Sequence, residues 1–303
     1  MHHRQTLGPA RVGLATLGVV AASVGFGLVP LFARGLTDSG MAPHAVALYR
    51  YVLASVVLAP IVWRWRRLWP VLLWGLGTGI VMALGWVGYV RAIEVVPVST
   101  AGVLYMTYPA FTLAISGLLF RERPAPRAIL AAAMIVVAAA VVMTPGAVDP
   151  ALIPLLLLSL AAPAGFGLGI SVLVHKMTPI PALARIGIVS MGSVLGLLPL
   201  ALGTPVQGLL PSGTQGWLMV LGIGLGTALV PQLIYTICSP IVGTARTAMA
   251  GSIELPVMFA VGWLAFGEPL TTAQAVSCVL VLTAIALTPA RRARSIAAVP
   301  DQT

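Results

Sequence analysis

Long apolar runs alternate along this chain with short polar segments that hold most of the charged residues. Each run approaches the length of about 20 residues that an α-helix needs to cross a hydrocarbon core of roughly 30 Å. Glycines and prolines inside the runs are compatible with this, because neighbouring membrane helices satisfy the freed backbone groups. The pattern predicts ten membrane spans, near residues 12–32, 43–62, 71–93, 98–119, 125–144, 151–174, 181–202, 216–239, 244–266 and 272–288.

The two halves of the chain repeat one another. The sequence Gly-Phe-Gly-Leu occurs at residues 25–28 and again at 165–168, and further matches follow in the same order, 140 to 147 residues apart. The matched pairs are Gly75 with Gly222, Gly77 with Gly224, Gly79 with Gly226, Tyr89 with Tyr235, Phe120 with Phe266, and Glu122 with Glu268. Ordered internal matches are typical of duplicated membrane units. We therefore predict two five-helix repeats, residues 12–146 and 147–289, with tails at 1–11 and 290–303.

Composition agrees with a membrane protein. Only 8% of the residues are charged, 59% are hydrophobic, and the mean hydropathy is +1.03. A soluble domain needs far more charge to cover its surface. The net charge of +10 would suggest nucleic acid in a soluble protein, but here the arginines lie in short loops between apolar runs. The tendency of cytoplasmic loops to be basic explains them better.

The basic residues predict the orientation in the membrane. If the N-terminus is cytoplasmic, twelve basic residues lie inside and only Arg34 and Arg91 lie outside. The twelve are Arg4, Arg11, Arg64, Arg66, Arg67, Arg121, Arg123, Arg127, Lys176, Arg291, Arg292 and Arg294. Both tails are therefore expected in the cytoplasm. Because five spans are an odd number, the second repeat would be inverted relative to the first, around a central cavity. The competing explanation is that glycine-rich helices resemble one another by chance.

Charged residues within the predicted spans are candidates for function, because a charge in the bilayer is costly. Arg50 lies midway along the second span and Glu254 lies in the ninth. Arg50 suits a substrate carboxylate or phosphate, and Glu254 suits proton coupling or contact with a cation. A purely structural role is an equal alternative for both. For Arg185 and Arg246, near span ends, we favour side chains that extend to the membrane interface.

Aromatic and amide side chains suggest the rest of a cavity lining. Trp86 and Tyr89 share one helix face, Gln232 and Tyr235 take the equivalent places in the second repeat, and Tyr105 and Tyr108 share a third face. If these faces converge, they would bind an amphiphilic small molecule. Packing in the core or anchoring at the interface is the alternative. Bends at four glycines are predicted as hinges: Gly25, Gly27, Gly165 and Gly167. Glu122 and Glu268 precede prolines, and we expect them to cap the following helices.

Several motifs resemble the drug/metabolite transporter superfamily, specifically its EamA-type members. They are Pro43 with Arg50, residues 89–92 leading to Val98-Ser99-Thr100-Ala101, and Glu254-Leu255-Pro256 running through Gly262 to Phe266-Gly267-Glu268-Pro269-Leu270. The resemblance implies two inverted five-helix units around a central cavity that exports or imports small metabolites. The chain departs from the family in having Arg121 where glycine is usual and Tyr108 where an acidic residue is frequent.

These observations predict a secondary-active transporter of small organic metabolites, with amino acids or related zwitterions and anions as substrates, working by alternating access in the cytoplasmic (inner) membrane. No enzyme, nucleotide or metal motif is present, so we expect no enzyme activity, cofactor or metal. The expected partners are the substrate and the bilayer, with protons as a candidate coupling ion, a homodimer left open, and no nucleic acid. The alternatives are an exporter of amphiphilic drugs and a lipid-handling, flippase-like subunit.

Overall fold

The computed structural model describes residues 9–144, 148–242, 247 and 250–287, and every regular element among them is a helix. Seven helical segments are long and apolar enough to cross a membrane: Ala10–Asp38, Pro43–Arg64, Arg66–Val95, Val98–Phe120, Pro150–His175, Ala182–Leu202 and Gly213–Val242. Three shorter apolar helices, Pro126–Val142, Glu254–Phe266 and Thr272–Leu287, lie within the remaining predicted spans. The prediction of an all-α membrane protein is confirmed, with seven segments of full length.

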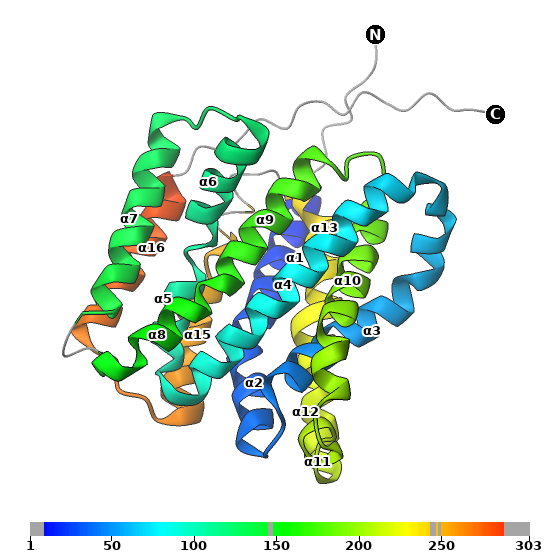
Figure 1. Ribbon diagram of the computed structural model, residues 1–303. Helices are drawn as coiled ribbons and strands as arrows, with labels where there is room; N and C mark the ends of the chain where they lie inside the picture. The colour runs from blue at the N-terminus through cyan, green and yellow to red at the C-terminus, as the bar shows by residue number, and fades with distance from the viewer. Residues whose placement is uncertain (1–8, 145–147, 243–246, 248–249, 288–303) are drawn as a thin grey trace.

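Several of these segments consist of more than one helix (Figure 1). In chain order the main elements are α1 (Pro9–Gly27), α2 (Val29–Asp38), α3 (Pro43–Arg64), η1 (Arg66–Leu68), α4 (Trp69–Val95), α5 (Val98–Tyr105), α6 (Tyr108–Phe120), α7 (Pro126–Val142), η2 (Pro150–Leu152), α8 (Ile153–Ser159), α9 (Ala161–His175), α10 (Ala182–Leu202), α11 (Val206–Leu209), α12 (Gly213–Leu221), the π-helix η3 (Gly222–Leu229), α13 (Val230–Val242), α15 (Glu254–Phe266) and α16 (Thr272–Leu287).

The breaks inside the segments follow from proline. A proline lacks the backbone N–H and collides with the carbonyl of the preceding turn, so a helix stops shortly before it. Pro30 lies at the start of α2, after the break at Leu28, and Pro109 lies at the start of α6. Pro163 follows the break at Leu160 between α8 and α9. The predicted bend in the first segment therefore coincides with a break, whereas α9 continues through Gly165 and Gly167.

Contacts between the two halves of the chain dominate the packing. Helix α10 lies against α3 and α4, α9 lies against α4 and α6, and α1 lies against α13. Helices α7 and α16 pack on each other at one edge of the molecule (Figure 1). Small residues permit the closest approaches: Gly79 of α4 touches the backbone of α10, and Gly192 of α10 touches the backbone of α4.

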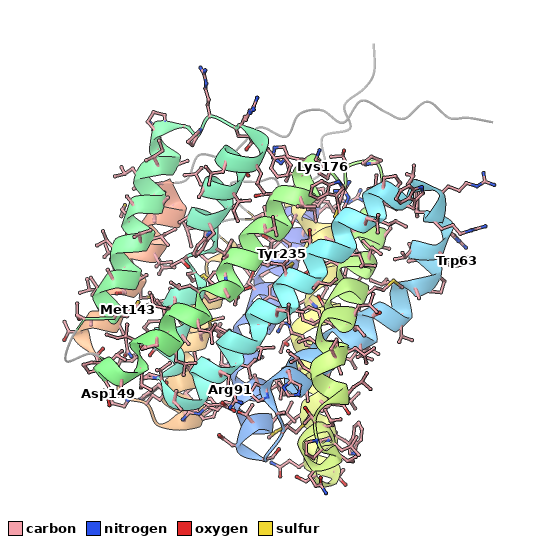
Figure 2. All side chains as sticks on the ribbon, viewed as in Figure 1. Trp63, Arg91, Met143, Asp149, Lys176 and Tyr235 are labelled. Carbon is pink, nitrogen blue, oxygen red and sulfur yellow. The ribbon has the colours of Figure 1, made fainter. Side chains whose placement is uncertain are left out.

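The helices run between two ends of the bundle (Figure 2). Lys176, after α9, lies at one end, and Arg91, near the end of α4, lies at the other, with Tyr235 of α13 between them. The end that carries Lys176 also holds Glu122, which contacts His175. The opposite end holds Glu268, which contacts the first residue of α5. Glu122 and Glu268 thus lie at opposite ends of the bundle.

Candidate functional site

A cavity of about 430 Å³ lies between the two halves of the chain. This volume falls within the range of roughly 300–1,000 Å³ that is usual for small-molecule sites. Along α9 the cavity extends to Leu173, and along α10 it begins at Arg185, both close to the end that carries Lys176. Along α2 it extends only to Val29. The cavity therefore reaches one end of the bundle and stops inside the other.

Seven of the eight predicted binding and coupling residues line this cavity: Arg50, Trp86, Tyr105, Tyr108, Gln232, Tyr235 and Glu254. The eighth, Tyr89, lies behind the lining, where its ring packs against Trp86 at 5.0 Å and Tyr105 at 5.5 Å between ring centroids. Its buried hydroxyl has no hydrogen-bond partner among the described residues. The helix faces inferred from sequence spacing thus converge, with Tyr89 as a supporting residue.

Arg50 is only 9% exposed, and two neighbouring side chains hold its guanidinium in place. The Arg50 guanidinium lies 4.4 Å from the centroid of the Trp86 ring, and its Nη1 donates a 3.1 Å hydrogen bond to Oγ1 of Thr227 in η3. Stacking on an indole and donation from one edge fix the orientation of the planar guanidinium. No described carboxylate forms an ion pair with it.

Glu254 supplies the opposite charge to the same cavity. It is the first residue of α15 and follows a turn at Ser252–Ile253. No described side chain forms an ion pair or hydrogen bond with its carboxylate. Arg50 and Glu254 therefore place opposite charges in the cavity without an ion pair to any described side chain.

Aromatic rings form much of the remaining wall. Phe166 lies 5.0 Å from Tyr108 and 6.0 Å from Tyr105, and Phe26 lies 6.0 Å from Tyr235, measured between ring centroids. Sequence reasoning missed both phenylalanines, although each belongs to the repeated Gly-Phe-Gly-Leu stretch. The duplication itself was the signal that pointed to them. Tyr51, Ser23 and Ser190 add hydroxyl groups that were not among the predicted residues.

The two halves place equivalent residues at equivalent positions in this site. The turn Met106–Thr107 precedes Tyr108 at the start of α6, and Ser252–Ile253 precedes Glu254 at the start of α15, 146 residues later. Tyr108 and Glu254 both line the cavity. Under the predicted duplication, one half thus has a tyrosine where the other half has the carboxylate.

The four glycines predicted as hinges lie at close contacts next to the cavity. A Cβ atom at Gly25 would lie 2.6 Å from Cγ of Pro231, and one at Gly165 would lie 3.0 Å from Cα of Met82. At Gly27 the corresponding obstacle is Cβ of Val257 at 2.7 Å, and at Gly167 it is the Thr112 nitrogen at 2.8 Å. Each glycine thus permits two helices to approach closely.

Glu122 and Glu268 contact segments other than the following helices, which they were expected to cap. The carboxylate of Glu268 accepts hydrogen bonds from Arg34 of α2 at 2.6 Å and from the backbone nitrogen of Val98, at the start of α5, at 2.8 Å. Glu122 lies 3.1 Å from Nε2 of His175 at the end of α9. These contacts join helices distant in the sequence, because tertiary packing brings those helix ends to the two carboxylates.

Arg185 and Arg246 are the remaining charged candidates from the predicted spans. Arg185 lines the mouth of the cavity and donates hydrogen bonds to the carbonyl oxygens of Ile180 and Thr178. Its contacts are with the loop before α10. Arg246 lies outside the described residues. Within the described ranges, no group of three or more His, Cys, Asp or Glu side chains could hold a metal ion.

Comparison with known proteins agrees with this architecture. Sixteen chains of solved structures match, and one of them, titled "Crystal structure of protein", has a TM-score of 0.61 at 19% identity, covering 91% of this chain and 96% of its own. That likeness concerns the fold alone. No curated protein matches the chain.

A family match extends over much of the first half. Residues 13–144 match the sequence model of the EamA-like transporter family. This match confirms the resemblance found in the motifs, and members of the family are transporters of small molecules rather than enzymes. Over residues 13–144, the chain is thus similar to the EamA-like transporter family, the family that its motifs resemble.

Proposed function

We propose that this protein is a secondary-active transporter of small zwitterionic metabolites, with amino acids as the leading class. The observation that carries the proposal is that Arg50 and Glu254 line one cavity of about 430 Å³ and form no ion pair with any side chain that the structure describes. A buried charge without a counter-ion is unfavourable. A zwitterion would neutralise both charges at once, its carboxylate on Arg50 and its ammonium on Glu254. The rings of Tyr105, Tyr108 and Phe166 would contact its apolar part.

Alternating access between two inverted repeats is the mechanism that we propose. Three kinds of feature support repeats at 12–146 and 147–289: the equivalent turns at 106–107 and 252–253, equivalent cavity residues, and the positions of Glu122 and Glu268 at opposite ends of the bundle. Among the predicted hinges Gly25, Gly27, Gly165 and Gly167, we propose Gly25 and Gly165 as the points of relative movement. The three shorter apolar helices would complete ten spans.

The arginines support an orientation with the Lys176 end in the cytoplasm. That end also carries the Arg121–Arg127 connection, next to Glu122. Because cytoplasmic loops are enriched in Lys and Arg, both tails would lie in the cytoplasm. Since the cavity reaches this end and stops short of the other, the conformation would be open to the cytoplasm.

An uptake screen in proteoliposomes tests the proposed substrate class. The screen compares zwitterionic amino acids, organic anions, amphiphilic cations and a fluorescent phospholipid for flippase activity. We expect saturable uptake of zwitterions, reduced at least about tenfold by Arg50→Ala, since a hydrogen bond to a charged group contributes about 1.5–3 kcal/mol. Arg91→Ala is the matched control, because its exposed side chain lies away from the cavity. Uptake of amphiphilic cations alone, or phospholipid movement alone, would reject the proposal in favour of drug export or lipid handling.

Glu254 is the proposed coupling residue, and a second experiment isolates it. Wild-type uptake is measured with and without a pH gradient and is expected to increase with the gradient. Glu254→Gln keeps the shape of the side chain but cannot release a proton, so uptake by this variant should be the same in both conditions. Equal dependence on the gradient in both proteins would remove Glu254 from coupling while leaving the substrate assignment intact.

A further inference from the structure

Two clusters, each of a basic residue, a glutamate and a phenylalanine, lie at opposite ends of the bundle. At one end, Glu268 pairs with Arg34 at 2.6 Å, and the Arg34 guanidinium lies 4.5 Å from the centroid of the Phe266 ring. At the other end, Glu122 pairs with His175 at 3.1 Å, and the His175 ring stacks on Phe120 with a centroid distance of 4.2 Å and an interplanar angle of 4°. We call these the Arg34 clamp (Arg34, Phe266, Glu268) and the His175 clamp (His175, Phe120, Glu122).

The clamps are counterparts under the internal duplication. Phe120 and Glu122 precede Phe266 and Glu268 by 146 residues, and Arg34 precedes His175 by 141. Both ring nitrogens of His175 face acceptors, because Nδ1 lies 2.8 Å from the carbonyl oxygen of Ser171 while Nε2 faces Glu122. A histidine that donates from both nitrogens is a cation. In that form it reproduces the cation–carboxylate–phenyl arrangement of the Arg34 clamp.

Both clamps are closed in one conformation, although the cavity reaches only one end of the bundle. If the clamps were gates, the clamp at the end that the cavity reaches would be open. The cavity extends along α9 to Leu173, two residues before His175, yet the His175 clamp is intact. In this conformation one clamp is therefore closed at the end that the cavity reaches, and the other is closed at the end that it does not reach.

The clamps connect helices of one cavity wall only. The first wall consists of α1, α2, α5, α6, α9 and α15, and the second wall of α3, α4, α10, η3 and α13; every residue that lines the cavity belongs to one of these two walls or to the short segment before α15. The Arg34 clamp joins α2 to the end of α15, and Glu268 also binds the start of α5. The His175 clamp joins α9 to the end of α6. Gly27 and Gly167 make further contacts within this wall, to Val257 and to Thr112.

The walls meet along α4 and α9 and along α1 and α13, and the other two glycines lie at close contacts in these two interfaces. Gly25 of α1 meets Pro231 of α13, and Gly165 of α9 meets Met82 of α4. Beyond these points, at the closed end, Phe32 of α2 rests on Gly222 of η3. The second wall is closely packed in itself, because Gly79 and Gly192 bring α4 and α10 into backbone contact and Arg50 joins α3 to η3.

We propose that Arg34 and His175 are positioning residues whose clamps keep the first wall together throughout transport, so that the walls move as two bodies, each built from both repeats, about Gly25 and Gly165. This inference rests on the proposed function and gives it a mechanical basis. Glu254 lies on the first wall and Arg50 on the second. A zwitterion bound to both would therefore connect the two bodies.

Cross-linking distinguishes clamps from gates. In a background with Cys238→Ser and Cys278→Ala, three cysteine pairs are introduced: Arg34→Cys with Glu268→Cys, Glu122→Cys with His175→Cys, and, between the walls, Phe32→Cys with Gly222→Cys. We expect a short thiol cross-linker to leave at least half of the uptake with either clamp pair. Cross-linking of the pair between the walls should lower uptake about tenfold or more, and uptake should recover when a cleavable linker is cut. Loss of uptake on cross-linking either clamp pair would overturn the proposal.

A second readout does not depend on the substrate. After a clamp pair has been cross-linked, Gln232→Cys in the cavity is exposed to a membrane-impermeant thiol reagent from each side. Labelling from both sides supports clamps that stay closed, and labelling from one side only contradicts them. If the unmodified protein transports no compound of the screen, the proposed function fails, while this labelling still tests the clamps.

Single substitutions at His175 test its role as a positioning residue. His175→Arg places the residue of the Arg34 clamp in the other clamp, so uptake and thermal stability should stay close to wild type. His175→Ala should lower the maximal rate while the KM for substrate stays unchanged, because His175 does not line the cavity. Equal loss in both variants, or a changed KM in His175→Ala, would contradict the assignment.

Discussion

At the residue scale, the departure of Arg121 from the family pattern has a structural consequence. Arg121 ends α6 with φ of 53°, and its counterpart Gly267 ends α15 with φ of 64°. Both helices thus end in a left-handed residue, and among the described residues Arg121 is the one non-glycine residue with positive φ. That conformation costs a side-chain-bearing residue about 1–2 kcal/mol, whereas glycine adopts it freely.

This asymmetry predicts opposite effects of two substitutions. Arg121→Gly should raise the free energy of unfolding by up to about 1 kcal/mol, since the relief of strain is partly offset by the greater freedom of glycine in the unfolded chain. Gly267→Ala should lower it by about 1 kcal/mol. Thermal unfolding in detergent measures both. A stabilised Gly267→Ala protein would show that the left-handed conformation carries no strain here.

At the element scale, the packing of α4 on α10 depends on glycines that face the partner helix. A Cβ atom at Gly79 would collide with the carbonyl oxygen of Val189, whereas nothing lies within 4 Å of the Cβ position at Gly77, two residues away on the same helix. The matched pair Gly75-Gly77-Gly79 and Gly222-Gly224-Gly226 was one of the signs of duplication. Its members nevertheless serve different contacts, because η3 is a π-helix and the corresponding part of α4 is not.

Gly79→Ala should therefore destabilise the protein by about 1–3 kcal/mol, the usual cost of overpacking. Gly77→Ala should be neutral or slightly stabilising, because alanine favours the helix over glycine by up to about 1 kcal/mol. Unfolding in detergent compares the two variants, which differ only in the face of α4 that they alter. Equal destabilisation of both would contradict the close contact between α4 and α10.

The proposed pivots belong to the same scale. Gly25→Ala and Gly165→Ala each place a methyl group between the walls, at 2.6 Å from Pro231 and 3.0 Å from Met82. We expect each to lower the transport rate at least about tenfold while membrane insertion persists, since insertion depends on hydropathy and not on this contact. Gly13→Ala, which meets nothing within 4 Å, is the control. Wild-type rates in both pivot variants would remove the pivot role.

At the scale of the whole molecule, the inverted arrangement predicts where exposed residues lie relative to the membrane. Arg123 and Leu270 are exposed and follow α6 and α15. Arg123→Cys should be labelled by an impermeant maleimide from the cytoplasmic face, and Leu270→Cys from the opposite face. Labelling of both from one face would contradict the inverted repeats and, with them, the proposed transport mechanism.

The sequence by itself determined the class of protein, the positions of the apolar segments and seven of the residues that line the cavity. Those features are local or periodic: hydropathy depends on the residue, and spacings of three or four place side chains on one helix face. That is why Trp86, Gln232 and Glu254 were found without a structure.

Tertiary structure alone decided which faces meet and which helices form each wall. No spacing rule relates Arg34 to Glu268 or His175 to Glu122, because these pairs are joined by packing between distant segments. The same packing turned Tyr89 away from the cavity and brought Phe26 and Phe166 into its wall. How a side chain packs depends on all of its neighbours in space at once, so the periodicity of the sequence cannot predict it.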